Sequence, residues 1–137
     1  EFHGDPRRVI LTGLSIGGYG AYALAYEHPD RFAALVPICG GILGHSSAST
    51  VVQLPATAGS TDPYALVAAR IREIPTWIFH GADDPVIPVE EARHMDAALK
   101  AAGADVRYTE LPGTGHNAWD PAYGNADLWK WLLNQRR

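Results

Sequence analysis

The chain has 137 residues, of which 47% are hydrophobic and 19% are charged, and its formal net charge at pH 7 is −4. This composition is typical of a globular chain with a sizeable core, and its weakly acidic balance argues against nucleic acid or an anionic membrane as a partner. The one cysteine, Cys39, excludes an intrachain disulfide framework and is expected to be a small buried residue.

The first elements along the chain are two short apolar runs with a helix between them. Residues 9–11 form a run that ends at a glycine, which is typical of a strand buried on both faces. From Gly17 to His28, apolar residues recur at three- and four-residue spacing, and Pro29 closes this predicted helix. Residues 32–41 form the second predicted buried strand.

The middle of the chain is predicted to be irregular. Residues 42–63 are rich in Ser, Thr, Ala and Gly and have no clear period, so they predict a long loop of the kind that is usually functional or mobile. A short helix follows over 64–73, with Asp62 as its N-cap and Pro63 in its first turn.

The last third of the chain alternates strands with helices. Strands are predicted over 74–81 and 104–113, and helices over 89–103 and 127–135. Four strand–helix repeats predict a mainly parallel sheet covered by helices on both faces, an α/β three-layer sandwich. We expect residues 1–137 to form a single domain.

The sequence G-L-S-I-G places Ser15 between the first strand and the first helix. In such a turn the residues two before and two after the serine nearly touch, so Gly13 and Gly17 are both expected to need the absence of a side chain. The forced backbone lifts the hydroxyl above the sheet, and the helix N-terminus points free N–H groups at the same place. The alternative is a glycine-rich turn whose serine has no role in catalysis.

A serine hydroxyl needs a base, normally a histidine that a carboxylate orients. The loop after the third strand holds Asp83 and Asp84, and the loop after the fourth strand holds His116. All three loops leave the carboxyl ends of parallel strands, where open α/β sheets place their sites. Only one of the adjacent acids can face Ser15, and Asp84 is favoured, with Asp83 capping or solvated.

The other histidines have ordinary interpretations. His80, at a strand end, is expected to be a satisfied core histidine. A metal site built from His80, Asp83, Asp84 and His116 is conceivable, but it lacks two histidines spaced on one helix. No metal or cofactor is therefore predicted. The remaining histidines lie on predicted loops or helix surfaces: His3, His28, His45 and His94.

Four segments resemble a known family. They are "DPRRVILTGLSIGGYGAYALAYEHPDRFAALVPICGG", "IPTWIFHGADDPVIP", "AAGADVRYTELPGTGHNAWDPAY" and "WKWLLNQRR". They resemble α/β-hydrolase esterases of the phospholipase/carboxylesterase and dienelactone-hydrolase type, and more closely the "predicted peptidase" group akin to feruloyl and polyhydroxybutyrate esterases. The resemblance covers nearly the whole chain except about residues 44 to 62.

The resemblance implies a serine hydrolase of carboxylic esters. The family pattern assigns Ser15 as nucleophile, Asp84 as the acid of H-G-x-x-D, His116 as base, and the N–H of Ile16 as one oxyanion donor. Esters are favoured over peptides because amide cleavage needs more protonation of the leaving group and more oxyanion support.

An ester substrate also needs a pocket. Trp119 and Tyr123, together with the loop over 42–63, are expected to line the acyl or alcohol pocket. The alternative is that these aromatic side chains form only a hydrophobic rim.

The chain departs from the family in one respect. A member normally has four strands and two helices before the serine turn, and one of that segment's loops supplies the second oxyanion donor. Without them, the strand over 9–12 becomes an apolar open edge that can pair with another chain. We therefore expect the C-terminal portion of the fold, or a minimal hydrolase that forms a homo-oligomer. The alternative function is a weak or inactive half that pairs through this edge, and the sequence indicates no compartment.

Overall fold

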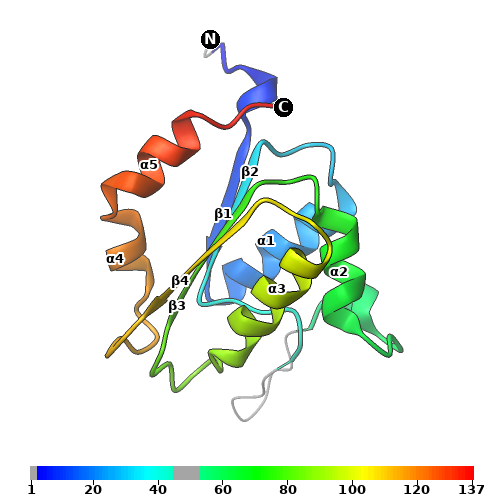
Figure 1. Ribbon diagram of the computed structural model, residues 1–137, viewed down its shortest axis with the longest axis vertical. Coiled ribbons are helices and arrows are strands. Elements are labelled where there is room, and N and C mark those ends of the chain that lie inside the picture. Colours follow the sequence, from blue (N-terminus) through cyan, green and yellow to red (C-terminus); the bar gives the residue numbers. More distant parts are fainter. Residues whose placement is uncertain (1–2, 45–52) are drawn as a thin grey trace.

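The protein is described by a computed structural model over residues 3–44 and 53–137. Four parallel strands form one sheet in which spatial order follows chain order (Figure 1). They are β1 (Ile10–Leu14), β2 (Ala34–Ile38), β3 (Thr76–Gly81) and β4 (Val106–Leu111). All four strands were predicted from the sequence; β2, β3 and β4 are shorter than predicted and β1 is longer.

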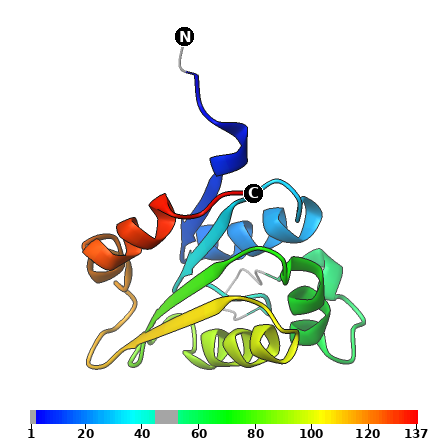
Figure 2. The same ribbon diagram turned by 45° about the horizontal axis from the view of Figure 1, so that its top comes forward.

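Helices cover both faces of this sheet, which confirms the three-layer α/β sandwich (Figures 1 and 2). On one face lie α1 (Ile16–Glu27), α2 (Pro63–Ile71) and α3 (Glu90–Ala101). On the other lie α4 (Trp119–Tyr123) and α5 (Ala126–Leu133). Each layer has its own apolar core, so the sheet is sandwiched between two packed interfaces.

The two central strands, β2 and β3, are buried on both faces, which explains why their sequences are continuous apolar runs. Every residue of β2 and of β3 is buried, because each strand has a neighbour on both sides and helices above and below. Leu35 and Ile78 enter the core beneath α1, α2 and α3, whereas Val36 and Phe79 enter the core beneath α5. A strand covered on both faces needs no polar alternation.

Some local structure was not predicted. The chain forms short 3-10 helices, η1 (Pro6–Arg8) and η2 (Pro55–Thr57), and the helix α4. Asn117 lies just before Ala118, the N-cap of α4, and its side chain accepts a hydrogen bond from the N–H of Asp120 in the first turn. Part of the predicted loop over 42–63 lies outside the described residues.

Strand β1 forms one edge of the sheet. Among the described residues it pairs only with β2, in the register Ile10 opposite Ala34. Val9 and Ile10, at its start, keep 36% and 38% of their surface exposed. The open apolar edge expected from the sequence is thus present. Within residues 3–44 and 53–137, no helix has the length and apolar character to cross a membrane.

Candidate active site

The three side chains that the sequence predicts as catalytic meet at the carboxyl ends of the strands. Ser15 follows β1, Asp84 follows β3 and His116 follows β4. The His116 Nε2 atom lies 2.8 Å from the Ser15 Oγ, and its Nδ1 lies 2.8 Å from the Asp84 Oδ2. The structure therefore brings Ser15, His116 and Asp84 into one chain of hydrogen bonds. Asp83, the weaker candidate for the acid, is exposed to solvent.

The backbone at Ser15 is strained and leaves its side chain free. Its φ and ψ of 54° and −124° lie where non-glycine residues are uncommon, which costs about 1–3 kcal/mol. The Ser15 N–H donates to the Ile38 carbonyl at 2.9 Å, which ties the turn to the end of β2. Although Ser15 is the N-cap of α1, its hydroxyl makes no capping hydrogen bond and so can face His116.

Only one of the two glycines in this turn needs to lack a side chain. A Cβ on Gly13 would stand 2.0 Å from the carbonyl oxygen of Gly17, well inside contact distance. A Cβ on Gly17 would meet nothing within 4 Å. The expectation for Gly17 was therefore wrong: its backbone oxygen approaches Gly13, but its own Cβ position points into open space.

The carboxylate of Asp84 is held from two sides. Its side chain is fully buried. The Oδ1 atom accepts hydrogen bonds from the N–H groups of Val86 at 2.8 Å and Ile87 at 3.0 Å, and Oδ2 faces His116. Burial by itself would raise the pKa of Asp84, but the hydrogen bonds from His116 and these two amides outweigh it and hold the pKa below its usual value.

This ionisation state fixes the protons of the site. An ionised carboxylate only accepts hydrogen bonds, so the Nδ1 of His116 carries a hydrogen and donates it in a hydrogen bond to Asp84. In the neutral imidazole, Nε2 is then an acceptor and the Ser15 hydroxyl donates to it. The arrangement can remove a proton from Ser15 while Asp84 stabilises the imidazolium that forms.

Cys39 lies directly beside this site, which its sequence context did not indicate. It is fully buried, as predicted, and has a positive φ of 40° at the end of β2. Burial raises the pKa of the thiol to about 11, and the nearby backbone amides of Ser15 and Ala118 only partly oppose this rise. Cys39 is therefore a protonated thiol at neutral pH, packed beside the turn that holds Ser15.

Several side-chain atoms that could bind a metal ion lie close together beside Ser15. Among the residues that the structure describes, the ligand atoms of Cys39, Asp84 and His116 lie within 4.8 Å of one another. This set differs from the one considered from the sequence: it contains Cys39 and lacks His80 and Asp83. Within it, Asp84 and His116 are hydrogen-bonded to each other at 2.8 Å.

Ile16 directly follows Ser15 and is the first residue of α1. Amides in the first turn of a helix lack an acceptor within that helix and can receive a negative charge. The Ile16 side chain is 66% exposed and lies away from the core. The position predicted for an oxyanion donor is thus at a helix N-terminus beside the Ser15 hydroxyl.

The two predicted pocket aromatics lie on α4, at different distances from the site. The Trp119 ring meets the His116 ring edge to face, with centroids 5.6 Å apart. Tyr123 lies one turn further along and donates its hydroxyl hydrogen to the Thr12 Oγ at 2.9 Å, because Thr12 itself donates to the Val36 carbonyl. Trp119 is therefore next to the hydrogen-bonded triad, whereas Tyr123 is bound to the middle of β1.

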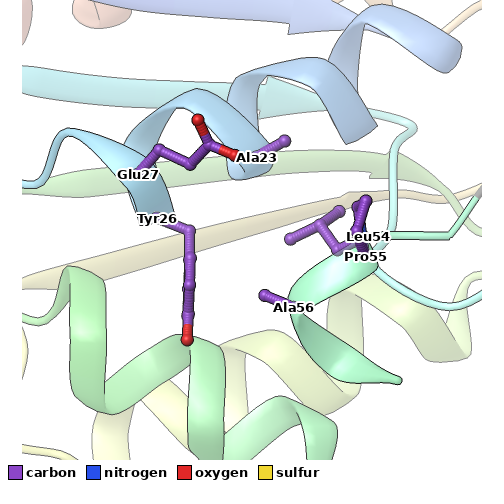
Figure 3. Close-up of a pocket in the computed structure, with 6 residues that line it drawn as sticks. All are labelled: Ala23, Tyr26, Glu27, Leu54, Pro55 and Ala56. Atoms are coloured by element: carbon purple, nitrogen blue, oxygen red, sulfur yellow. The ribbon is translucent and has the colours of Figure 1, made fainter.

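An apolar groove runs along α1 away from Ile16. Its first part is lined by Ile16, Tyr19, Gly20, Ala23, Gln53, Leu54 and Pro55. Its narrower continuation, shown in Figure 3, is lined by Ala23, Tyr26, Glu27, Leu54, Pro55 and Ala56. One wall is thus a helix that begins at the serine turn, and the other is part of the segment predicted to line a substrate pocket.

Comparisons with known proteins place this chain in a family. The family model described as the prolyl oligopeptidase family matches residues 1–136. Esterase LipQ of Mycobacterium tuberculosis is 45% identical over 159 residues, which cover 89% of this chain and 35% of that protein. Acyl-protein thioesterase 1 of Gibberella zeae is 32% identical over 113 residues, which cover 82% of this chain and 43% of that protein.

A solved structure agrees with these matches. The crystal structure of a thermostable esterase superposes with a TM-score of 0.79 and 37% identity, covering all of this chain and 33% of that one. The chain therefore spans less than half the length of these relatives. The chain belongs to the prolyl oligopeptidase family and has the fold of the α/β-hydrolase esterases.

Proposed function

We propose that this chain is a serine hydrolase of carboxylic esters and that residues 1–137 act as one α/β-hydrolase-like domain. The observation that carries the proposal is the pair of 2.8 Å contacts from His116, one to the Ser15 Oγ and one to Asp84. A serine, a histidine and a buried carboxylate in this order of contact are the parts that nucleophilic catalysis by serine requires. The esterase names of the relatives support the same class of reaction.

Each side chain has a role in the proposed reaction. His116 takes the hydroxyl proton of Ser15 as the oxygen attacks the ester carbonyl, and the N–H of Ile16 donates to the resulting oxyanion. His116 then gives the proton to the departing alcohol, which leaves an acyl group on Ser15. Water, deprotonated by His116, hydrolyses this acyl-enzyme. Asp84 keeps the imidazole in the required tautomer throughout.

Short-chain or aryl esters are the substrates that the site favours. The apolar groove begins at Ile16, the residue next to the nucleophile, so it offers an apolar group of the ester a place along α1. Trp119 forms a further apolar wall beside His116. The Tyr123 hydroxyl is already engaged with Thr12, so we expect Tyr123 to contribute its ring to the rim of the pocket.

The test is turnover of p-nitrophenyl acetate and butyrate by the wild-type chain and by Ser15→Ala. We expect the variant to lose at least about 10³-fold in kcat. Glu73→Ala, at a side chain that is 78% exposed and lies outside the predicted pocket segment, is the control and should keep full activity. A prolyl p-nitroanilide run in parallel distinguishes amide from ester cleavage. Equal rates for wild type and Ser15→Ala would end the proposal.

A second candidate function rests on the exposed edge of the sheet. Ile10, the first residue of β1, and Val9 just before it are exposed, and β1 has β2 as its partner among the described residues. An apolar edge strand of this kind can pair with another chain, so we propose a homo-oligomer formed through β1. In this reading the chain is a weak or inactive hydrolase portion that pairs through its edge.

Light scattering and hydrogen exchange test the edge pairing. We expect the mass to exceed that of one chain, and amide exchange over residues 10–14 to slow as protein concentration rises. Ile10→Lys should weaken the association by placing a charge on the edge. A monomer whose β1 amides are protected at every concentration would refute the pairing, and a monomer that hydrolyses esters would leave the enzymatic proposal intact.

A further inference from the structure

His80 lies behind the proposed triad and touches its acid. Its side chain is fully buried at the end of β3. The Nε2 atom lies 2.9 Å from the Ile87 carbonyl oxygen and 3.3 Å from the Asp84 Oδ2, the same oxygen that faces His116. The expectation of a satisfied core histidine was wrong in one respect. The Nδ1 atom is buried and has no hydrogen-bond partner within residues 3–44 and 53–137.

These contacts define the protonation state of the ring. A carbonyl oxygen only accepts hydrogen bonds, so the Nε2 of His80 must carry a proton to bond Ile87. A second proton would have to sit on Nδ1, which is buried away from any acceptor in the described part of the chain. Burial lowers the pKa of His80 accordingly. His80 is thus a neutral imidazole with its hydrogen on Nε2.

The same hydrogen belongs to a closed set of contacts around Asp84. The Ile87 N–H donates to the Asp84 Oδ1, and the Ile87 carbonyl accepts from His80. His80 therefore holds the peptide that anchors one carboxylate oxygen, and its Nε2 packs 3.3 Å from the other. Loss of the His80 N–H would free the carboxylate to rotate about its side chain.

We propose that His80 is a positioning residue for ester hydrolysis, acting through Asp84: its Nε2–H holds the Ile87 peptide, whose N–H anchors the Asp84 Oδ1, and so keeps the Oδ2 directed at His116. The proposal rests on the proposed function of Ser15, His116 and Asp84. His80 touches neither Ser15 nor substrate in this role.

The proposal predicts a specific change in pH dependence. Without the His80 donor the Ile87 peptide is released and Asp84 can turn away from His116, so the carboxylate stabilises a protonated His116 less well. The acid limb of kcat/KM should therefore move to lower pH. The other charged or titratable groups that act on His80 are His116, Glu91 and Glu110, and none of them changes in the variants below.

The test compares His80→Leu, which removes the donor at similar volume, with His80→Gln, whose amide keeps an N–H within reach. We expect His80→Leu to lose about tenfold in kcat with KM nearly unchanged, and its acid limb to shift to lower pH. His80→Gln should restore most of kcat. His94→Gln, at an exposed histidine of α3, is the matched control and should behave as wild type. Wild-type kcat and an unmoved limb in a folded His80→Leu would overturn the proposal.

A measurement on the wild-type chain separates this proposal from the proposed function. Nitrogen-15 NMR of the imidazoles should report His80 as neutral, with its hydrogen on Nε2, from pH 6 to 8. The low-field proton of the His116 Nδ1–H should shift in His80→Leu. A charged His80 or the opposite tautomer would overturn the positioning role even if neither variant folds. An absence of ester turnover in the wild type would instead count against the proposed function.

Discussion

Gly81 at the end of β3 lies against the backbone of Gly115, in the loop that carries His116. A Cβ on Gly81 would stand 2.1 Å from the Gly115 carbonyl oxygen and 2.4 Å from that of Thr114. The Asp83 N–H also donates to the Thr114 carbonyl at 3.0 Å. The loops after β3 and β4 are thus pressed together at a glycine, and this contact brings Asp84 within reach of His116.

The first prediction concerns this contact. Gly81→Ala should push the His116 loop away from Asp84, because the atoms that its Cβ meets are backbone and cannot rotate aside. We expect kcat/KM for p-nitrophenyl acetate to fall by about 10²-fold, as is typical of an ångström-scale misplacement. Gly115→Ala is the matched control, since its Cβ would meet nothing closer than 3.9 Å. Equal activities of the two folded variants would show that the contact does not position His116.

The second prediction separates the two glycines around Ser15. Gly13→Ala should lower both the free energy of unfolding and the activity, because its Cβ would collide with the Gly17 carbonyl. Gly17→Ala should keep the fold and gain up to about 0.5–1 kcal/mol of stability, since alanine has a higher helix propensity than glycine and its Cβ meets open space. Urea unfolding of both variants tests this. A strongly destabilised Gly17→Ala would restore the original expectation that both positions require glycine.

The third prediction concerns Glu91, a buried carboxylate in the first turn of α3. It accepts hydrogen bonds from the N–H groups of Ile42 at 2.8 Å and Leu43 at 3.3 Å, and from the Tyr64 hydroxyl at 2.6 Å. It therefore ties the segment after β2 to α2 and α3. Hydrogen bonds to a buried charge contribute more than neutral ones, so Glu91→Gln should reduce the free energy of unfolding by about 1.5–3 kcal/mol.

Two further variants control the Glu91 measurement. Tyr64→Phe removes one donor and should cost about 1 kcal/mol, less than Glu91→Gln. Glu90→Gln changes the exposed neighbour, whose ion pair with Arg93 lies on the surface, and should have almost no effect. If Glu91→Gln and Glu90→Gln gave the same urea midpoint, Glu91 would not be the attachment of this segment.

The sequence predicted the parts of this site that obey local rules. Ser15, Asp84 and His116 each follow an apolar run, and parallel strands bring such positions to one edge. The contacts between loops were not predictable in this way. Nothing in the residues around Cys39 or Gly81 says that one lies under Ser15 and the other against Gly115, because these distances depend on how the strands are registered in space.

His80 illustrates the same limit from another side. Its place in a buried strand was evident from the apolar run around it, and the structure confirms that it is fully buried. Its contact with Asp84, however, depends on the turn over 84–87, which folds the carboxylate back onto the strand end. Burial could be read from the sequence, whereas the partner of the buried group required the turn geometry.

The last prediction concerns acid stability. Arg93 donates two hydrogen bonds to Glu110, at 2.7 and 2.9 Å, and Tyr108 donates a third at 2.6 Å. These contacts, Arg93 foremost, lower the pKa of Glu110 to about 2. A carboxyl whose pKa is depressed by folding stabilises the folded chain above its unfolded pKa, near 4.5, and loses that contribution as the pH falls toward 2.

Glu110→Gln should therefore flatten the fall in stability between pH 5 and pH 2.5, measured as the urea midpoint at each pH. The effect should be modest and should shrink in high salt, because the side chains of Arg93 and Glu110 are 48% and 30% exposed. Glu73→Gln is the matched control: Glu73 pairs with Arg72 at 3.1 Å, but its side chain is 78% exposed. Asp84 stays in both variants, so its own acid sensitivity is common to them. An identical pH slope in wild type and Glu110→Gln would show that the Arg93 pair contributes nothing to acid stability.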